Sequence, residues 1–181
     1  MRKHFLLIIL SIISSAMCRA QGNKTHAGLT DYDKKHYILT VDQKQIVLVA
    51  KTSPPFDRKK YVYALITVTL SNNSNDTLKY VNMTCGWDDA FTTNNKNIQI
   101  SGWGCDSNFP TVYKISPHRS VPFDIPFLVA KNLVGKKFRI GLYLIKPREG
   151  RSVIGDFEAF WHSKNSFDDC LIWSNDVMVP K

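Results

Sequence analysis

Two Gly-Trp pairs, each beside a cysteine, are the most distinctive chemical feature of the sequence. They bound the segment CGWDDAFTTNNKNIQISGWGC, which runs from Cys85 to Cys105. A disulfide between these cysteines would close a loop of about 20 residues and stabilise the fold by roughly 3 kcal/mol through the entropy it removes from the unfolded chain. The same cross-link would bring Trp87 and Trp103 close to one another.

Two uses of these paired indoles are open. As a ligand platform, Trp87 and Trp103 would stack on a sugar ring while Asp88 and Asp106 accept hydrogen bonds from its hydroxyl groups. As scaffold, both indoles would cover the disulfide, as aromatic side chains commonly do in β-sandwich domains. Burial is the commoner use of tryptophan, so the scaffold interpretation is favoured and the ligand platform is kept as a hypothesis.

The other reactive residues do not form a recognised site in the sequence. Zinc needs closely spaced ligand pairs such as C-x-x-C, and the Asp-Asp pairs at 88–89 and 168–169 lack the alternating spacing of a calcium loop. His162 and Asp168 share one segment, but no nucleophile-elbow pattern surrounds them. We therefore expect no catalytic residue, metal or cofactor, and an enzyme built around His162 and Asp168 is the least favoured hypothesis.

The first twenty residues have the pattern of a secretory signal peptide. MRKHFLLIILSIISSAMCRA has a basic start, an apolar run over 5–13 and small residues at its end. The apolar run is about half of the ~20 residues that a membrane-spanning helix needs. Cleavage near Ala20 would release a secreted or periplasmic protein without a transmembrane segment. Lipid anchoring through Cys18 is the less favoured alternative, because Met17 occupies a position where lipoprotein signals carry a small residue.

Charge and cysteine content fit an exported binding protein. The net charge of +9 falls by three, to +6, when the signal peptide takes Arg2, Lys3 and Arg19 with it. The remaining basic residues are scattered, which predicts a solvated surface and no nucleic-acid partner. Three cysteines remain in an oxidising compartment, and after pairing of Cys85 with Cys105 the third, Cys170, would be a buried or a surface thiol.

Alternating apolar residues predict strands along the whole chain after a loose, polar lead over 21–34. The clearest runs are at 36–41, 45–51, 61–70, 77–85, 111–116, 121–129, 136–145 and 170–179. Only 129–135 and 155–163 could form a helical turn. The pattern predicts a single domain over 35–181, an all-β, antiparallel Ig-like β-sandwich of about seven to nine strands.

Three details of this fold can be predicted from the strand runs. Pro122 and Pro126 lack amide donors on the same side of one strand, which predicts a strand at a sheet edge. Trp173 alternates with Leu171, Val177 and Val179, which predicts that all four face the core. Trp161 is expected to pack beneath a loop.

The segments ITVTLSNNSNDTLKYVNMTC and ISPHRSVPFDIPF resemble small exported Ig-like β-sandwich proteins of the Bacteroidota. They are also similar to the bacterial proteinase-inhibitor domain of the BsuPI type. The resemblance covers about residues 60–130 and implies a fold and a binding role without carrying over any catalytic residue. The expected function is an exported non-catalytic domain that binds a protein or glycan or serves in the cell envelope. The alternatives are a carbohydrate-binding module using Trp87 and Trp103 and a proteinase-inhibitor-like domain.

Overall fold

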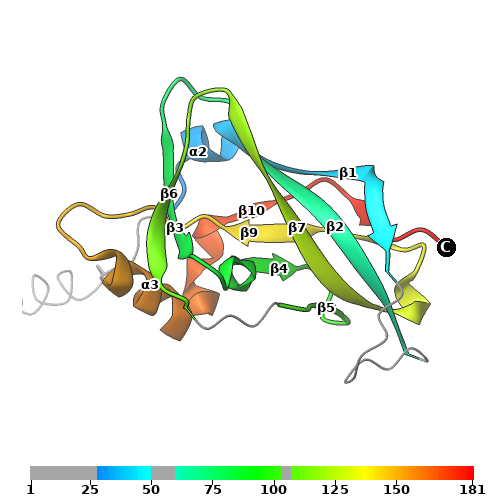
Figure 1. Cartoon of the computed structure of the whole chain (residues 1–181). Coiled ribbons are helices and arrows are strands. Elements are labelled where there is room, and N and C mark those ends of the chain that lie inside the picture. The colour runs from blue at the N-terminus through cyan, green and yellow to red at the C-terminus, as the bar shows by residue number, and fades with distance from the viewer. Residues whose placement is uncertain (1–27, 50–59, 103–106) are drawn as a thin grey trace, which may run out of the picture.

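The structure, a computed structural model, describes residues 28–49, 60–102 and 107–181, apart from the side chain of Asn165. Two layers of antiparallel strands pack face to face (Figure 1). The first layer has the strand order β1-β2-β7-β5, with bounds β1 (Tyr37–Leu48), β2 (Tyr61–Asn72), β7 (Arg119–Ala130) and β5 (Ile98–Ile100). β2 is the centre of this layer because it pairs with β1 on one side and along its whole length with β7 on the other.

The second layer is assembled from shorter strands. Its middle has the order β10-β9-β4, with bounds β10 (Leu171–Trp173), β9 (Ile140–Tyr143) and β4 (Phe91–Thr93). β8 (Lys137–Phe138) pairs with β11 (Val177–Met178), and β3 (Leu78–Met83) pairs with β6 (Pro110–Ile115). A bridge between Val81 and Ile145 joins β3 to the chain that leaves β9. The described strands of this layer thus form one irregular surface opposite the first.

Alternate residues of both layers meet in one apolar core. β2 contributes Ala64, Ile66, Val68 and Leu70, all fully buried, because successive side chains of a strand point to opposite faces. The facing side chains include Ile125 and Phe127 from β7 and Ile140, Leu142 and Leu144 from the second layer. The predicted antiparallel all-β sandwich is therefore confirmed. The described residues form eleven strands rather than seven to nine, because β4 and β5 were not predicted and because breaks at Arg139 and at 174–176 each divide one predicted run into two strands. In the opposite direction, the predicted runs 36–41 and 45–51 form the single strand β1, with a register irregularity between Val41 and Ile46.

Helix α3 (Val153–His162) covers the outer side of β3 and β6 (Figure 1). Ser152 caps its N-terminus by accepting a hydrogen bond from the amide of Gly155. Phe157 and Phe160 are buried in a second, smaller cluster beside the main core. The sequence predicted only a helical turn here, because ten residues give too few repeats of the helical period to be distinctive. The described 3-10 segments are η1 (Trp87–Ala90), η2 (Lys131–Leu133) and η3 (Lys164–Cys170).

Part of the predicted loose lead is ordered. Helix α2 (Asp31–His36) begins at a capping box in which Thr30 and Asp33 each bond the other's backbone amide. Leu29, just before it, is buried in the main core. The expected signal sequence, with Cys18 and Ala20, lies outside the described residues. No helix in the described part of the chain is long and apolar enough to cross a membrane.

The predicted edge position holds for one half of β7. β5 pairs with β7 only between Phe127 and Val129. Over residues 119–126, which include both prolines, no described strand pairs with that side of β7. The carbonyl of Pro126 accepts a hydrogen bond from the amide of Ser101 as the chain leaves β5. The two prolines therefore lack an amide donor only on the side of β7 where no described strand would accept a hydrogen bond from it.

Candidate functional site

The structure places Trp87 and Asp88 in scaffold rather than on an open platform. Trp87 begins η1 and is half-buried, with its ring centroid 6.0 Å from Phe91 and 5.5 Å from Phe123. Asp88 is 8% exposed, and burial raises the pKa of its carboxyl group. Its Oδ2 lies so close to Gly102 that a Cβ on that glycine would clash with it. Asp88 is therefore not a surface acceptor for a sugar hydroxyl.

The other half of the predicted platform lies outside the described residues, since it consists of Trp103, Cys105 and Asp106. Cys85 is disulfide-bonded, but its predicted pairing with Cys105 stays a prediction for the same reason. Cys170 keeps its thiol, which is buried in the small cluster beneath α3. Its Sγ lies 3.7 Å from Oδ1 of Asp169.

Trp173 is not a core residue, contrary to the prediction. β10 buries Ile172 on the inner face, so its neighbours Leu171 and Trp173 point outward and are only half-buried. Val177 faces inward, five residues after Ile172, because the break at 174–176 shifts the alternation by one residue. Trp161 is also misassigned: it is 54% exposed on the outer side of α3.

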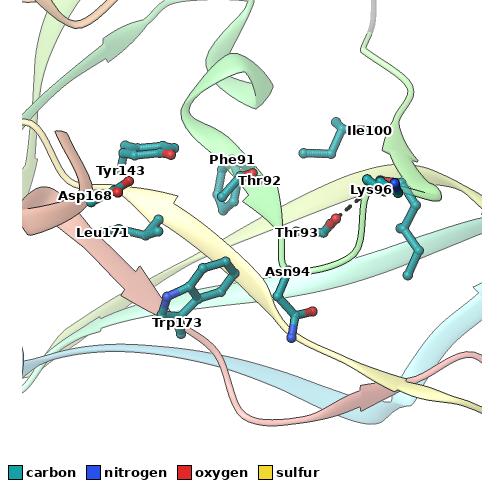
Figure 2. A pocket seen from close by; sticks show the side chains of 11 residues that line it. Phe91, Thr92, Thr93, Asn94, Lys96, Ile100, Tyr143, Asp168, Leu171 and Trp173 are labelled. Atoms are coloured by element: carbon teal, nitrogen blue, oxygen red, sulfur yellow. Dashed lines mark hydrogen bonds between the residues drawn. The ribbon is translucent and has the colours of Figure 1, made fainter. Parts of the chain in front are cut away.

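The outward-facing Trp173 borders a hollow of about 600 Å³ (Figure 2). Side chains of β10, β9, β4, β5 and the β4–β5 loop line it together with Asp168 of η3. The lining residues are Phe91, Thr92, Thr93, Asn94, Lys96, Ile98, Ile100, Tyr143, Asp168, Leu171 and Trp173. In Figure 2, Trp173 and Asn94 lie at one end of the hollow, and Tyr143 and Asp168 lie at another. We call this feature the Trp173 hollow.

Gly141 makes room for the indole across the middle strand. An added Cβ at this position would lie 2.9 Å from Cδ1 of Leu171 and 2.9 Å from Cζ3 of Trp173. Such distances are sterically forbidden, so the absence of a side chain lets Trp173 lie close over β9. On the opposite neighbouring strand, Cγ2 of Thr92 would be 3.0 Å away. Three strands therefore have to pair in this register to form the floor.

Arg139 and Asn94 fix the rim beside the indole. The amide of Arg139 donates to Oδ1 of Asn94 at 2.8 Å, and the amide of Asn94 donates to the carbonyl of Arg139 at 3.2 Å. The Arg139 guanidinium then lies 5.4 Å from the centroid of the Trp173 ring, within cation–π distance. Thr93 donates from Oγ1 to the carbonyl of Asn95 at 2.8 Å, which helps to hold the loop between β4 and β5 in place. The rim is thus built before any ligand arrives.

The opposite end of the hollow carries charge. Burial, with a further contribution from the charge of Asp168, raises the pKa of the Tyr143 phenol. Lys164 lies 5.1 Å from the Tyr143 ring and donates from Nζ to the carbonyl of Asp89 at 2.8 Å. Burial lowers the pKa of this lysine, against the opposing effect of Asp89. Lys164 therefore ties η3 to η1 behind the hollow, and its ammonium group is already hydrogen-bonded.

His162 and Asp168 do not come together. His162 lines a separate cavity of about 270 Å³ with Asp89, Glu158 and Trp161, whereas Asp168 lines the Trp173 hollow. No hydrogen bond to the His162 ring is found within the described part of the chain. Among these residues there is also no group of three His, Cys, Asp or Glu side chains that could hold a metal ion. The structure thus does not assemble the site around His162 and Asp168.

The hollow combines an indole with hydroxyl, amide, ammonium and carboxylate groups. This is the chemistry that recognises a ligand with one apolar face and many hydroxyl groups. Sequence reasoning missed the site because it depends on the pairing of β10, β9 and β4. The one available signal was Gly141, a glycine inside a strongly alternating strand, which marks a close approach. No protein-family model matches the chain, and no curated protein sequence shows significant similarity to it.

Proposed function

We propose that the protein is an exported, non-catalytic binding domain that recognises a carbohydrate chain at the Trp173 hollow. The observation that carries the proposal is the half-buried indole of Trp173 on the outer face of the second layer, over the gap left by Gly141. An indole held in this way offers a flat apolar surface to the C–H face of a sugar ring, which would have to flank or displace the Arg139 guanidinium 5.4 Å from the ring centroid. The export signal and the resemblance of residues 60–130 to exported sandwich proteins support the same role.

Polar groups around the indole are suited to hydroxyl recognition. Thr92, Asn94 and Asp168 supply acceptors, and Thr92, Asn94 and Lys96 supply donors, at the boundary of the hollow. Asn94 and Lys96 are exposed, so they can exchange bound water for ligand without burying an unpaired group. The volume of the hollow, about 600 Å³, exceeds the volume that one sugar ring fills. A chain of sugars that crosses the rim is therefore a better fit than a monosaccharide.

The test is retention on insoluble polysaccharides followed by a glycan array. We expect wild-type protein to be retained on at least one glycan and Trp173→Ala to lose about tenfold or more in affinity, since removal of a stacked aromatic costs about 1–3 kcal/mol. Trp173→Phe keeps a ring and should lose less. Equal retention of Trp173→Ala and wild type would contradict the proposal.

Trp161→Ala is the matched control. Trp161 is also an exposed tryptophan, but it lies on α3 and lines a different cavity. Its removal should leave glycan retention unchanged. Thermal unfolding of all three variants separates loss of the ligand surface from loss of the fold. If retention depends on Trp161 instead, or if a proteinase rather than a glycan is bound, the assignment to the Trp173 hollow is wrong.

A further inference from the structure

A second cavity lies at the unpaired side of β7, beside β3 and β6. Its volume is about 320 Å³, and it is separate from the Trp173 hollow. Four of its seven lining residues are aromatic; the lining consists of Tyr80, Asn82, Trp87, Tyr113, Pro122, Phe123 and Asp124. We propose that this aromatic cage binds an alkylated ammonium group. The inference does not depend on the proposed carbohydrate site, since the two cavities share no residue.

The rings come from both layers and are held in place before a ligand enters. Tyr80 of β3 and Tyr113 of β6 stack with centroids 5.6 Å apart. Trp87 and Phe123 of β7 lie 5.5 Å apart with their planes inclined by 45°. The Tyr113 hydroxyl donates to the carbonyl of Met83 at 3.3 Å, which fixes the outer ring of the stacked pair. Four aromatic side chains therefore border one small space, and aromatic side chains gathered around a small space can recognise quaternary ammonium ions.

Tyr80 adds a neutral ring to the cage. It is 2% exposed, and burial raises the pKa of its phenol. The ring therefore stays uncharged at physiological pH and contributes its π-electrons without a competing charge.

The surroundings of the cavity do not oppose a cation. No lysine, arginine or histidine is among the described residues that line it. The carboxylate of Asp124 lies on the outer face of β7, opposite to Phe123, where its Oδ1 accepts a hydrogen bond from Oγ1 of Thr67 at 2.7 Å. The attraction for a cation inside the cavity would therefore come from the aromatic side chains.

A sugar fits this cavity less well, because the side-chain amide of Asn82, which lines the cavity, already has hydrogen-bond partners. Nδ2 of Asn82 donates to the carbonyl of Trp87 at 3.2 Å, and its Oδ1 accepts from the amide of Met83 at 2.8 Å. Hydroxyl groups would therefore find few partners, and each one left unsatisfied carries a cost. An alkylated ammonium needs none, since its methyl groups contact the rings and its diffuse charge is attracted to them. Free choline-type molecules and methylated lysine side chains share this chemistry.

The experiment compares choline with 3,3-dimethylbutan-1-ol, a neutral molecule of nearly the same shape, by NMR titration of the folded protein. We expect choline to bind about tenfold more tightly than the neutral isostere, since a partly desolvated cation–π contact contributes about 1–2 kcal/mol. Tyr113→Leu should weaken choline binding, while Tyr113→Phe keeps the ring and should preserve it. Equal affinities for the two ligands, or no saturable binding of choline, would overturn the proposal.

Asp124→Asn provides the matched charge variant. It keeps the shape of the side chain and an oxygen that accepts from Thr67, while it removes the negative charge. Neither choline affinity nor affinity for the neutral isostere should change; a fall of choline affinity to that of the neutral isostere would show that the carboxylate, and not the rings, attracts the cation, and would contradict the cage. A peptide that contains trimethyllysine is titrated in the same way. The tighter binder of the two shows whether the natural ligand is a free choline-type molecule or a methylated lysine side chain. Trp173→Ala should leave choline binding intact, so failure of either proposed site is distinguishable from failure of the other.

Discussion

The nearly buried carboxylate of Asp33 both caps helix α2 and forms an ion pair with Lys146. Its Oδ2 accepts hydrogen bonds from the amide and hydroxyl of Thr30, both at 2.9 Å, and its Oδ1 pairs with Nζ of Lys146 at 3.0 Å. Burial by itself would raise the pKa of this carboxyl, but the hydrogen bonds and the charge of Lys146 outweigh it and hold the pKa below its ordinary value. The ionised form therefore fastens the start of α2 to the chain beyond β9.

This pair predicts a pH-dependent effect of Asp33→Asn. At neutral pH, the free energy of unfolding should fall by about 1–3 kcal/mol, because a buried hydrogen-bonded charge is removed. A depressed folded-state pKa contributes stability above the ordinary value of about 3.9, and this contribution is lost as the pH falls below it. The deficit of the variant should therefore shrink at acidic pH. Urea unfolding at neutral and acidic pH measures both values.

Asp31→Asn is the control for this prediction. Asp31 lies in the same helical turn but is exposed. Its replacement should change stability by about 0.5 kcal/mol or less, as is usual for surface substitutions. An Asp33→Asn deficit that stays constant with pH, or an equal deficit in Asp31→Asn, would show that the ion pair is not its source.

At the scale of elements, side-chain amides close the sandwich where the two layers meet. Oδ1 of Asn175 accepts from the amide of Val41 at 2.7 Å, and its Nδ2 donates to the Val41 carbonyl at 3.0 Å. In the reverse direction, Gln43 accepts from the amide of Met178 at 2.9 Å and donates to the Met178 carbonyl. Each amide replaces one rung of a β-ladder, so β1 and β11 cover each other's exposed backbone.

The amide closure predicts that Asn175→Asp destabilises the edge of β1. A carboxylate can still accept from the amide of Val41, but it cannot donate to the carbonyl and repels it. We expect a loss of about 1–2 kcal/mol in the free energy of unfolding and faster hydrogen exchange over residues 37–41. Gln99→Glu, the same kind of change on the exposed side of β5, should have little effect. Unchanged exchange at Val41 in Asn175→Asp would contradict this account.

Strand faces could be predicted from the sequence wherever the alternation is local. In Val62 to Leu70 and Val121 to Val129 the predicted alternate residues face the core, although Tyr63 and Pro126 on the opposite faces are buried as well. The alternation through Trp173 failed because the break at 174–176 depends on a contact between Asn175 and Val41, 134 positions apart. The Trp173 hollow was missed for the same reason, because its floor requires a specific pairing of three strands. Periodicity contains no information on such distant register.

At the scale of the whole molecule, the covalent state of the cysteines bears on stability and on the predicted export. Cys85 is disulfide-bonded, and Cys170 is a buried thiol in the small cluster that α3 covers. If Cys105 is the partner of Cys85, the cross-link joins the end of β3 to the chain that follows β5. It would then tie together the two segments on either side of Trp87 in η1.

The last prediction is a count of alkylated cysteines in the secreted protein. Unfolded without reductant, the mature chain should take one alkyl group, at Cys170, and after reduction it should take three. Its mass should correspond to a chain that begins at Gln21, and a lipid-bearing Cys18 would contradict cleavage after Ala20. Reduction should lower the free energy of unfolding by about 3 kcal/mol, the value for a loop of this length. More than one alkyl group before reduction would show that Cys85 and Cys105 are not paired.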